Sequence, residues 1–290
     1  MKYKLHKEWK KYTLGSNIIS SIRGISVKKL YEVSSFKRVP SVSISSKYSC
    51  NISVSKETLN FKRFLYRSLT WFSLKNSDLY TVSTNSDQKF LKNQFKLSHN
   101  IEVIPNWVLF KKPLKKFSER HSKKILSVGR LENQKNFSAL INIFSNTDVE
   151  IDIVGTGSMF NELVKQKEEL NTKVNFLGKL NFDELQQLYS NYNIFVSTST
   201  FEGNPKTILE AQANDCLVIA LEENNIKEIV IDEQTGFICN INNFQEKVLN
   251  SLNESSINKD IIKNAKQRVE KYNNLENIIS MEIKLLSELN

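Results

Sequence analysis

Cysteine is scarce in this chain of 290 residues. It occurs three times, as Cys50, Cys216 and Cys239, at widely separated positions. An odd and scattered set of this kind excludes a framework of paired disulfide bonds. It indicates a compartment in which thiols stay reduced.

Long hydrophobic runs are also missing. The stretch from Met1 to Lys11 contains no apolar segment of the kind found in a secretory signal. No run approaches the roughly 18 apolar residues of a membrane-spanning helix. We therefore expect a cytoplasmic protein.

Acidic residues are outnumbered by basic ones, and the formal net charge is +10. A basic chain attracts nucleic acid, an anionic membrane face or polyanionic substrates, although a general abundance of Lys and Asn explains the charge equally well. No zinc-finger spacing or RNP-type motif occurs, so no nucleic-acid partner is expected. His6, His99 and His121 are not spaced as metal ligands or as part of a triad, and we expect no metal and no cofactor.

A charged stretch with one proline, residues 111–123, divides the chain and is typical of a linker. Beyond it, apolar and amphipathic segments alternate. Strands are predicted at 124–128, 150–154, 174–177, 194–197, 217–220 and 236–239, and helices at 137–145, 159–170, 182–190, 205–213, 226–231 and 244–252. Such alternation predicts an α/β fold with a doubly wound parallel sheet, and ligands at the carboxyl ends of its strands.

The segments on either side of this region are less regular. Residues 1–110 are predicted to form an incomplete domain of the same style, with helices at 2–12 and 61–74 and strands at 17–22, 39–44, 79–83 and 103–104. Residues 258–290 are predicted to be helices rich in Lys and Glu. The expected domains are therefore 1–110, 123–257 and a helical tail, 258–290.

The most informative segment runs from the strand at 194–197 into the helix at 205–213. Asn204 is predicted to cap this helix and Pro205 to occupy its first position, where no N–H is needed. Glu202 then precedes the helix N-terminus and Glu210 lies one to two turns inside it. A helix N-terminus suits phosphate, and the two carboxylates can accept hydrogen bonds from hydroxyls. A ligand made of sugar, diphosphate and ribose would fit this pattern.

Glycines and an acid follow successive predicted strands. Gly129, Gly155, Gly178 and Glu202 each come just after a strand. Because the carboxyl ends of parallel strands meet at one edge of a sheet, we expect these residues to share that edge.

An ordered series of motifs resembles the glycosyl transferases group 1 family, the retaining, nucleotide-sugar-dependent enzymes of GT-B fold. The matching stretches are 78–83, 103–106, 127–131 with Lys135-Asn136, 154–157, 174–180, 199–211, 228–230 and 235–237. The resemblance implies two Rossmann-like domains with doubly wound parallel sheets, the N-terminal one shortened and facing the acceptor.

The resemblance also implies roles for individual residues. Arg130 and Lys135 would bind the donor diphosphate and stabilise the charge that grows on it, while Glu202 would contact the sugar and Glu210 the ribose. Two fixed cations beside a leaving phosphate act most strongly in the transition state, so they would replace a metal. The remaining donor-binding candidates are Gly129, Leu180, Gly203, Asn204, Lys206 and Thr207. No protein nucleophile is implied.

Each of these residues has a simpler interpretation when taken alone. Arg130 and Lys135 could be solvated charges, and the two acids could be a helix-cap acid and a surface acid. Gly155 and Gly157 are more often turn glycines than phosphate-binding residues.

The sequence departs from the family pattern in four places. The N-terminal domain starts at what corresponds to a middle helix, so its sheet would have an open edge that a partner chain could cover. Ser46 falls where many relatives carry a histidine. Asn214-Asp215 replaces a turn rich in small residues, and Asp215 is expected to tolerate the left-handed conformation there. Asn224-Asn225 replaces glycines, and their Cβ atoms are expected to crowd the approach to phosphate.

We expect a glycosyltransferase that moves a sugar from a nucleotide-diphosphate donor to a hydroxyl of a glycan or lipid-linked acceptor, in surface polysaccharide biosynthesis. The basic surface fits peripheral docking on the anionic inner face of the cell membrane. The alternative is a non-catalytic or split-subunit partner that binds nucleotide sugar for another glycosyltransferase chain. A nucleic-acid binder is the weaker third interpretation.

Overall fold

The computed structural model describes residues 79–95, 101–110, 115, 119–253 and 258–288. The chain forms two compact units, one from Met1–Pro105 with Ile278–Asn290 and one from Asn106–Asn277. The elements predicted at 2–12, 17–22, 39–44 and 61–74, and Ser46, lie outside the described residues.

The described part of the first unit contains a small strand–helix–strand motif. Strands β1 (Tyr80–Val82) and β2 (Ile101–Val103) pair in parallel, and α4 (Asn85–Phe95) connects them. Strand β1 was predicted, β2 was predicted to start two residues later than it does, and α4 was not predicted. Its start is marked by the hydroxyl of Thr84, which accepts a hydrogen bond from the Asp87 amide at 3.1 Å.

The second unit is built on a six-stranded sheet in which every neighbouring pair is parallel, in the order β5-β4-β3-β6-β7-β8. The strands are β3 (His121–Val128), β4 (Glu150–Val154), β5 (Val174–Gly178), β6 (Tyr192–Ser197), β7 (Leu217–Leu221) and β8 (Phe237–Cys239). The order reverses between β3 and β6, which confirms the predicted doubly wound topology.

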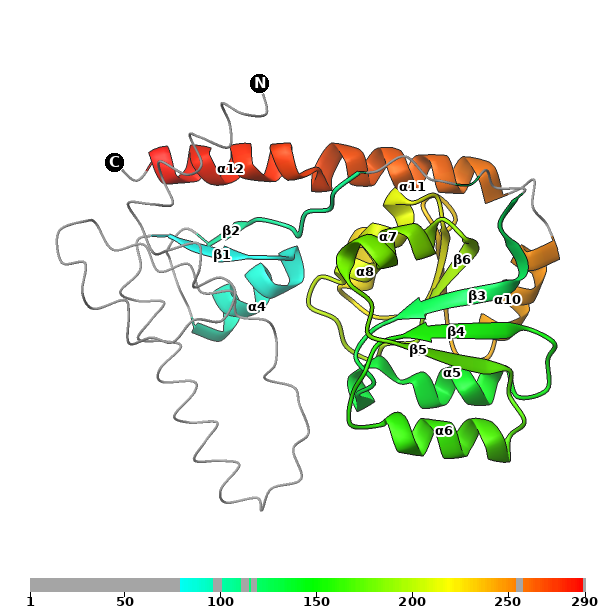
Figure 1. The fold of residues 1–290 in the computed structure, drawn as a ribbon. Helices are drawn as coiled ribbons and strands as arrows, with labels where there is room; N and C mark the ends of the chain where they lie inside the picture. Colours follow the sequence, from blue (N-terminus) through cyan, green and yellow to red (C-terminus); the bar gives the residue numbers. More distant parts are fainter. Residues whose placement is uncertain (1–78, 96–100, 111–114, 116–118, 254–257, 289–290) are drawn as a thin grey trace, which may run out of the picture. The chain divides into compact units, whose positions relative to one another are not determined.

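Helices cover both faces of this sheet (Figure 1). They are α5 (Phe137–Ile143), α6 (Phe160–Glu169), α7 (Phe182–Tyr189), α8 (Lys206–Ala213), α9 (Ile226–Ile229), α10 (Phe244–Asn253) and α11 (Asn258–Asn273). Neighbouring strand residues bury into separate cores: Ile125 packs with side chains of α5, α6 and α10, and Leu126 with those of α7, α8 and α11. Burial on both faces explains why the strands read as short apolar runs.

Several segment boundaries differ from the predictions by one to three residues. Two of these differences concern the elements next to the site. Strand β3 begins at His121, because the His121 amide donates to the carbonyl of Asn191 and extends the pairing with β6. The end of the charged stretch is therefore strand, not linker. Helix α8 begins at Lys206, with Pro205 in an extended conformation as its N-cap residue and no side-chain cap. The prediction that Asn204 caps this helix was wrong by one position.

The turn after α8 forms as expected. Asp215 adopts a left-handed conformation with φ of 61°. The buried guanidinium of Arg120 donates to the carbonyls of Asn214 and Asp215 at 3.0 and 3.1 Å, which satisfies the helix C-terminus. Lys266 adds an ion pair to Asp215 at 2.9 Å.

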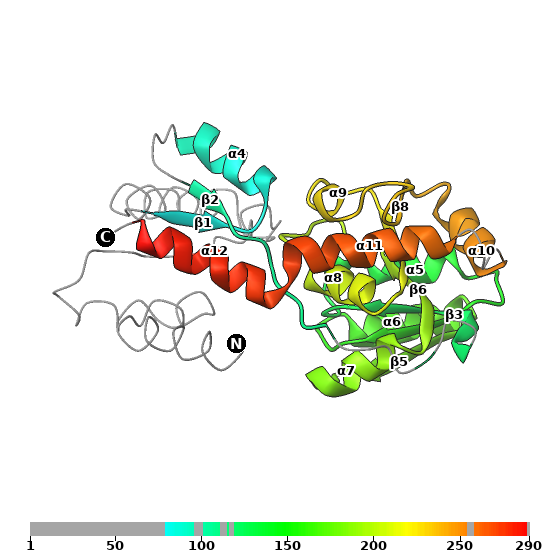
Figure 2. The ribbon, with the colours of Figure 1, turned by 90° about the horizontal axis from the view of Figure 1, so that it is seen from above.

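Residues 106–108 belong to the second unit, so the division lies nearer to 105 than to the expected 110. The side chain of Asn273 donates to the Asn106 carbonyl at 2.7 Å, and the Val108 amide donates to the Asn273 carbonyl at 2.9 Å. Helix α11, which ends at Asn273, lies along α8 (Figure 2). The tail is thus not a separate domain: α11 packs within the second unit, and α12 (Leu275–Ser287) crosses the division at residue 278.

Candidate functional site

The carboxyl ends of β3 and β6 are neighbours at the point where the strand order reverses. Open α/β sheets bind ligands at this point, because the loops that leave the two strands turn to opposite faces. Gly129 follows β3 and Glu202 lies on the loop after β6, so the predicted common edge is present. The Gly129 amide donates to Val154 and the Gly155 amide to Gly178, which joins the neighbouring strand ends.

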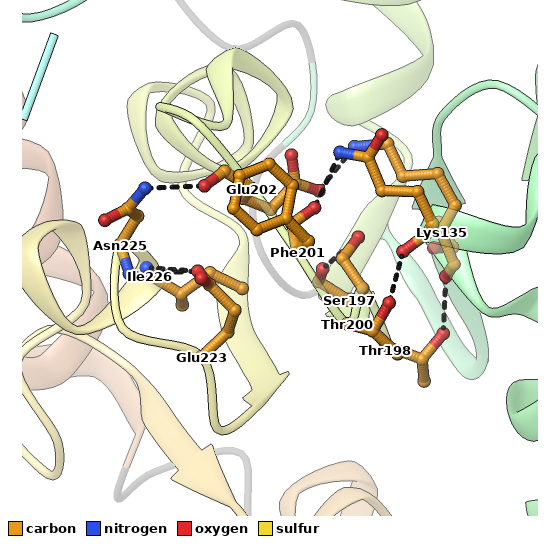
Figure 3. A network of polar contacts seen from close by, with 12 residues as sticks. Lys135, Ser197, Thr198, Thr200, Phe201, Glu202, Glu223, Asn225 and Ile226 are labelled. Carbon is orange, nitrogen blue, oxygen red and sulfur yellow. Dashed lines mark hydrogen bonds and ion pairs between the residues drawn. The ribbon is translucent and has the colours of Figure 1, made fainter. Parts of the chain in front are cut away.

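Hydrogen bonds fasten the loop after β3 to the loop after β6 (Figure 3). The Thr198 hydroxyl lies 3.2 and 3.1 Å from the carbonyls of Lys135 and Asn136. The Thr200 amide donates to the Gln134 carbonyl at 3.0 Å, and the Gln134 side chain donates to the Phe201 carbonyl at 2.7 Å. The short helix η4 (Asn133–Lys135) and the segment 198–201 therefore form one connected edge.

Lys135 and Glu202 form an ion pair across these loops. The Lys135 Nζ lies 2.5 Å from Glu202 Oε1, and the side chains are 17% and 8% exposed. The stem of Lys135 packs over Gly129, where an added Cβ would lie 3.0 Å from the Lys135 Cδ. A cation and a carboxylate are thus held together in a sheltered position, where charge interactions are strong.

Arg130 lies on the same loop with an exposed side chain. Its charge helps to lower the pKa of Glu132, after the larger effect of hydrogen bonds from the Ser158 amide and hydroxyl. In the described part of the chain, no hydrogen bond or ion pair joins Arg130 to Glu202 or Glu210. Of the two predicted catalytic cations, Lys135 is thus paired with an acid, and Arg130 lies exposed on the same loop.

The start of α8 is braced by the segment that opens the second unit. The Asn106 side chain donates to the Asn204 carbonyl at 2.6 Å. The Lys206 ammonium lies 3.9 Å from the centre of the Trp107 ring, within the range of a cation–π interaction. Gly203 has open space around its Cα, since an added Cβ would meet nothing within 4 Å. Asn106 and Trp107 were not among the predicted site residues, although 103–106 was part of the family resemblance.

Glu210 lies inside α8 and is buried, at 7% exposure. The Tyr189 hydroxyl donates to its Oε2 at 3.2 Å and also approaches the Thr207 carbonyl at 3.3 Å. Burial raises the pKa of Glu210, while the Lys206 charge and the Tyr189 hydrogen bond oppose that rise. Tyr189 was not predicted as a site residue, because its sequence context fits an ordinary core position. Leu180, the predicted residue of the loop after β5, packs against the same core as Tyr189.

Replacing Tyr189 by phenylalanine is expected to make stability more dependent on pH. A carboxyl whose folded pKa lies above its unfolded value contributes stability below the unfolded pKa and loses it as pH rises through the folded pKa. The hydroxyl opposes the rise in the Glu210 pKa, so its removal enlarges this loss above the ordinary value of 4.5. Chemical denaturation should show Tyr189→Phe less stable by about 1 kcal/mol at neutral pH, with a smaller deficit near pH 4. In a Glu210→Gln background the deficit should not vary with pH; a deficit that still varied there would contradict this account.

Gly155 and Gly157 allow two loop backbones to touch. Gly155 has φ of +145°, and a Cβ there would lie 1.8 Å from the Gly129 carbonyl oxygen. A Cβ on Gly157 would lie 2.3 Å from the Leu131 carbonyl oxygen. Both contacts are within the protein, and they favour the structural interpretation of these glycines.

Asn225 contacts the Glu202 loop from the side opposite to η4 (Figure 3). Its side chain is buried and donates to the Glu202 carbonyl at 2.6 Å. Residues 224 and 225 were expected to crowd a ligand, and this contact within the protein was not predicted. No local pattern in the sequence signals it, because the burial of Asn225, which makes a hydrogen-bond partner necessary, follows from the fold.

The described residues contain no group of three His, Cys, Asp or Glu side chains placed to hold a metal ion. Among the helices of the described ranges, none combines the length and apolar character needed to cross a membrane.

Comparison with known proteins adds to this geometry. The family model described as "Glycosyl transferases group 1" matches residues 111–268. The "UDP-N-acetylglucosamine--peptide N-acetylglucosaminyltransferase GtfA subunit" of Streptococcus agalactiae is 28% identical over 208 residues, which cover 64% of this chain and 40% of that protein. The "N-acetylgalactosamine-N,N'-diacetylbacillosaminyl-diphospho-undecaprenol 4-alpha-N-acetylgalactosaminyltransferase" of Campylobacter jejuni is 27% identical over 193 residues, which cover 63% of this chain and 52% of that protein.

A solved structure, the sucrose-phosphate synthase of Thermosynechococcus elongatus, is similar with a TM-score of 0.75 at 19% identity, covering 88% of this chain and 68% of that one. This likeness concerns the fold, which is α/β and GT-B-like with parallel sheets. The chain spans about half the length of the curated relatives it matches.

Proposed function

The chain belongs to the glycosyl transferases group 1 family, and on this premise we propose that it moves a sugar from a nucleotide-diphosphate donor to a hydroxyl of a glycan or lipid-linked acceptor. The observation that carries the proposal is the sheltered Lys135–Glu202 pair beside the start of α8. A cation for phosphate and an acid for sugar hydroxyls then meet where a phosphate-binding helix begins.

Each candidate residue has a defined task in this proposal. Lys135 and Arg130 bind the diphosphate and stabilise its charge as the glycosidic bond breaks. Glu202 accepts hydrogen bonds from the sugar, and Glu210 accepts them from the ribose. The backbone of residues 203–207 and the Lys206 ammonium bind phosphate, while Gly129 leaves room for Lys135 and Leu180 borders the base. The acceptor attacks from the face that the diphosphate leaves, so the configuration is retained without a protein nucleophile or a metal.

The biological setting is part of the proposal. Relatives with names such as "Amylovoran biosynthesis glycosyltransferase AmsD" and the undecaprenol-linked transferase above favour a role in surface polysaccharide biosynthesis. The net charge of +10 favours peripheral docking on an anionic membrane face from the cytoplasm, where a lipid-linked acceptor would lie.

A second candidate function is a nucleotide-sugar-binding subunit of a split enzyme. It is favoured by one observation, that a relative is described as a subunit and is matched over only 40% of its length. Purification with and without the products of neighbouring genes separates the two functions. A chain that transfers sugar alone as a monomer would exclude the subunit role.

Titration with UDP-, GDP- and ADP-linked sugars tests donor binding directly. Calorimetry is expected to show saturable binding of at least one of them. In a Trp9→Phe/Trp71→Phe background the same donor should change the fluorescence of Trp107, because a diphosphate attracts the Lys206 ammonium that lies 3.9 Å from this ring. Lys206→Met should abolish the fluorescence change. No heat with any of the three donor classes would contradict the proposed function.

A further inference from the structure

Glu202 is held through its carboxylate and through its backbone by two different loops (Figure 3). Its carboxylate pairs with Lys135, which comes from the loop after β3. Its carbonyl accepts the Asn225 side chain at 2.6 Å, from the segment between β7 and α9. Asn225 is only 4% exposed, so the hydrogen bond is sheltered from water.

Asn225 is itself fixed by Glu223. One carboxylate oxygen of Glu223 accepts the amides of Asn225 and Ile226, at 2.9 and 3.1 Å. These amides lie at the start of α9, where backbone N–H groups have no partner within the helix. Glu223 thereby fixes the backbone from which the Asn225 side chain reaches Glu202. Burial raises the pKa of Glu223, and hydrogen bonds from backbone amides, including that of Glu202, oppose the rise, so Glu223 and Asn225 together hold the Glu202 backbone.

The backbone on the C-terminal side of Glu202 depends on this hydrogen bond from Asn225. On the N-terminal side, the Phe201 carbonyl accepts a hydrogen bond from the Gln134 side chain. Gly203, on the C-terminal side, has open space around its Cα, and the next hold is that of the Asn106 side chain on the Asn204 carbonyl at 2.6 Å. Without Asn225, the backbone between Glu202 and α8 would be fixed less firmly, and the Glu202 carbonyl would lose its buried donor.

We propose that Asn225, held in place by Glu223, is a positioning residue that fixes the backbone of Glu202 so that its carboxylate meets the donor sugar. The inference rests on the proposed function for the role of Glu202, whereas the hold on the loop can be tested without any ligand. Asn225 acts through Glu202 and does not touch the reacting atoms in this account.

Hydrogen exchange of the ligand-free protein tests whether Asn225 fixes the backbone of Glu202. Asn225→Ala is expected to speed amide exchange in peptides covering residues 198–206 by about tenfold, the factor for one lost hydrogen bond. Asn224→Ala is the matched control, since Asn224 is the exposed neighbour with the same side chain. Unchanged exchange in Asn225→Ala, or equal acceleration in both variants, would overturn the proposal.

A milder variant keeps the test decisive should Asn225→Ala not fold. Asn225→Asp has the same shape but cannot donate while ionised. We expect exchange faster than that of wild type at pH 8 and close to that of wild type near pH 4, where a protonated carboxyl can donate. An Asp variant that behaves like wild type at pH 8 would also overturn the proposal.

Binding of UDP and of UDP-N-acetylglucosamine then tests the link to the sugar. Asn225→Ala should change UDP affinity less than twofold and weaken UDP-N-acetylglucosamine by about tenfold, because only the sugar depends on Glu202. An equal loss for both probes would indicate a general structural role and contradict positioning. Should wild type bind neither probe, the proposed function would fail for this donor, and the exchange experiment would still decide the role of Asn225.

Discussion

Replacing Lys135 by methionine is expected to lower the rate of sugar transfer by about 10²- to 10³-fold. The ammonium is the sheltered cation beside the start of α8, and its charge acts most strongly as the diphosphate leaves. The stem of Lys135 packs over Gly129, and methionine retains much of that packing. Steady-state kinetics with the donor identified by calorimetry measures the effect. A loss below threefold would contradict a catalytic role for Lys135.

The same replacement should also destabilise the protein, which calls for a control. Glu202 would keep a charge at 8% side-chain exposure with no cation beside it. Breaking such a pair costs about 3 kcal/mol, whereas removing both charges costs much less. The double variant Lys135→Met/Glu202→Gln should therefore regain most of the free energy of unfolding while remaining inactive. Recovered activity in the double variant would show that the single variant had failed through instability.

Replacing Gly155 by alanine is expected to destabilise the second unit strongly. The new Cβ would lie 1.8 Å from the Gly129 carbonyl oxygen, and φ of +145° is strained for any residue with a Cβ. The oxygen belongs to the backbone and the backbone also fixes the position of the Cβ, so no side-chain rotation relieves the overlap. We expect a loss of more than about 4 kcal/mol in denaturant unfolding, or no soluble protein.

Gly203→Ala is the matched control for that change. It also adds one methyl to a loop glycine at the same edge, but nothing lies within 4 Å of the new Cβ. Its free energy of unfolding should stay within about 0.5 kcal/mol of wild type. Similar stabilities for the two variants would contradict the assignment of Gly155 to close backbone packing.

Much of the second unit was predictable because its signals are local. Strand β4 was predicted with its observed bounds, since three β-branched apolar residues lie between Glu150 and Gly155 and only Asp152 interrupts them. Helix α4 was missed because it has little apolar periodicity: of its residues, only Asp87 and Leu91 are buried. The start of α8 was predicted one residue too early, because Pro205 fits both the N-cap and the first helical position.

The contacts of the site were less predictable than its residues. Lys135 and Glu202 were both named from the sequence, but they are 67 residues apart, and their pairing depends on the neighbouring places of β3 and β6 in the sheet. Asn225 and Tyr189 reach Glu202 and Glu210 across other loops and helices. Such partners follow from the packing of whole elements, which local patterns do not contain.

The bonds from Thr198 and Gln134 have a consequence for the energetics of ligand capture. Because they join the two loops before any ligand arrives, neither loop has to be immobilised separately on binding. A preorganised edge of this kind avoids much of the loss of conformational entropy that mobile loops undergo on binding. More of the free energy of each polar contact with the ligand therefore contributes to affinity.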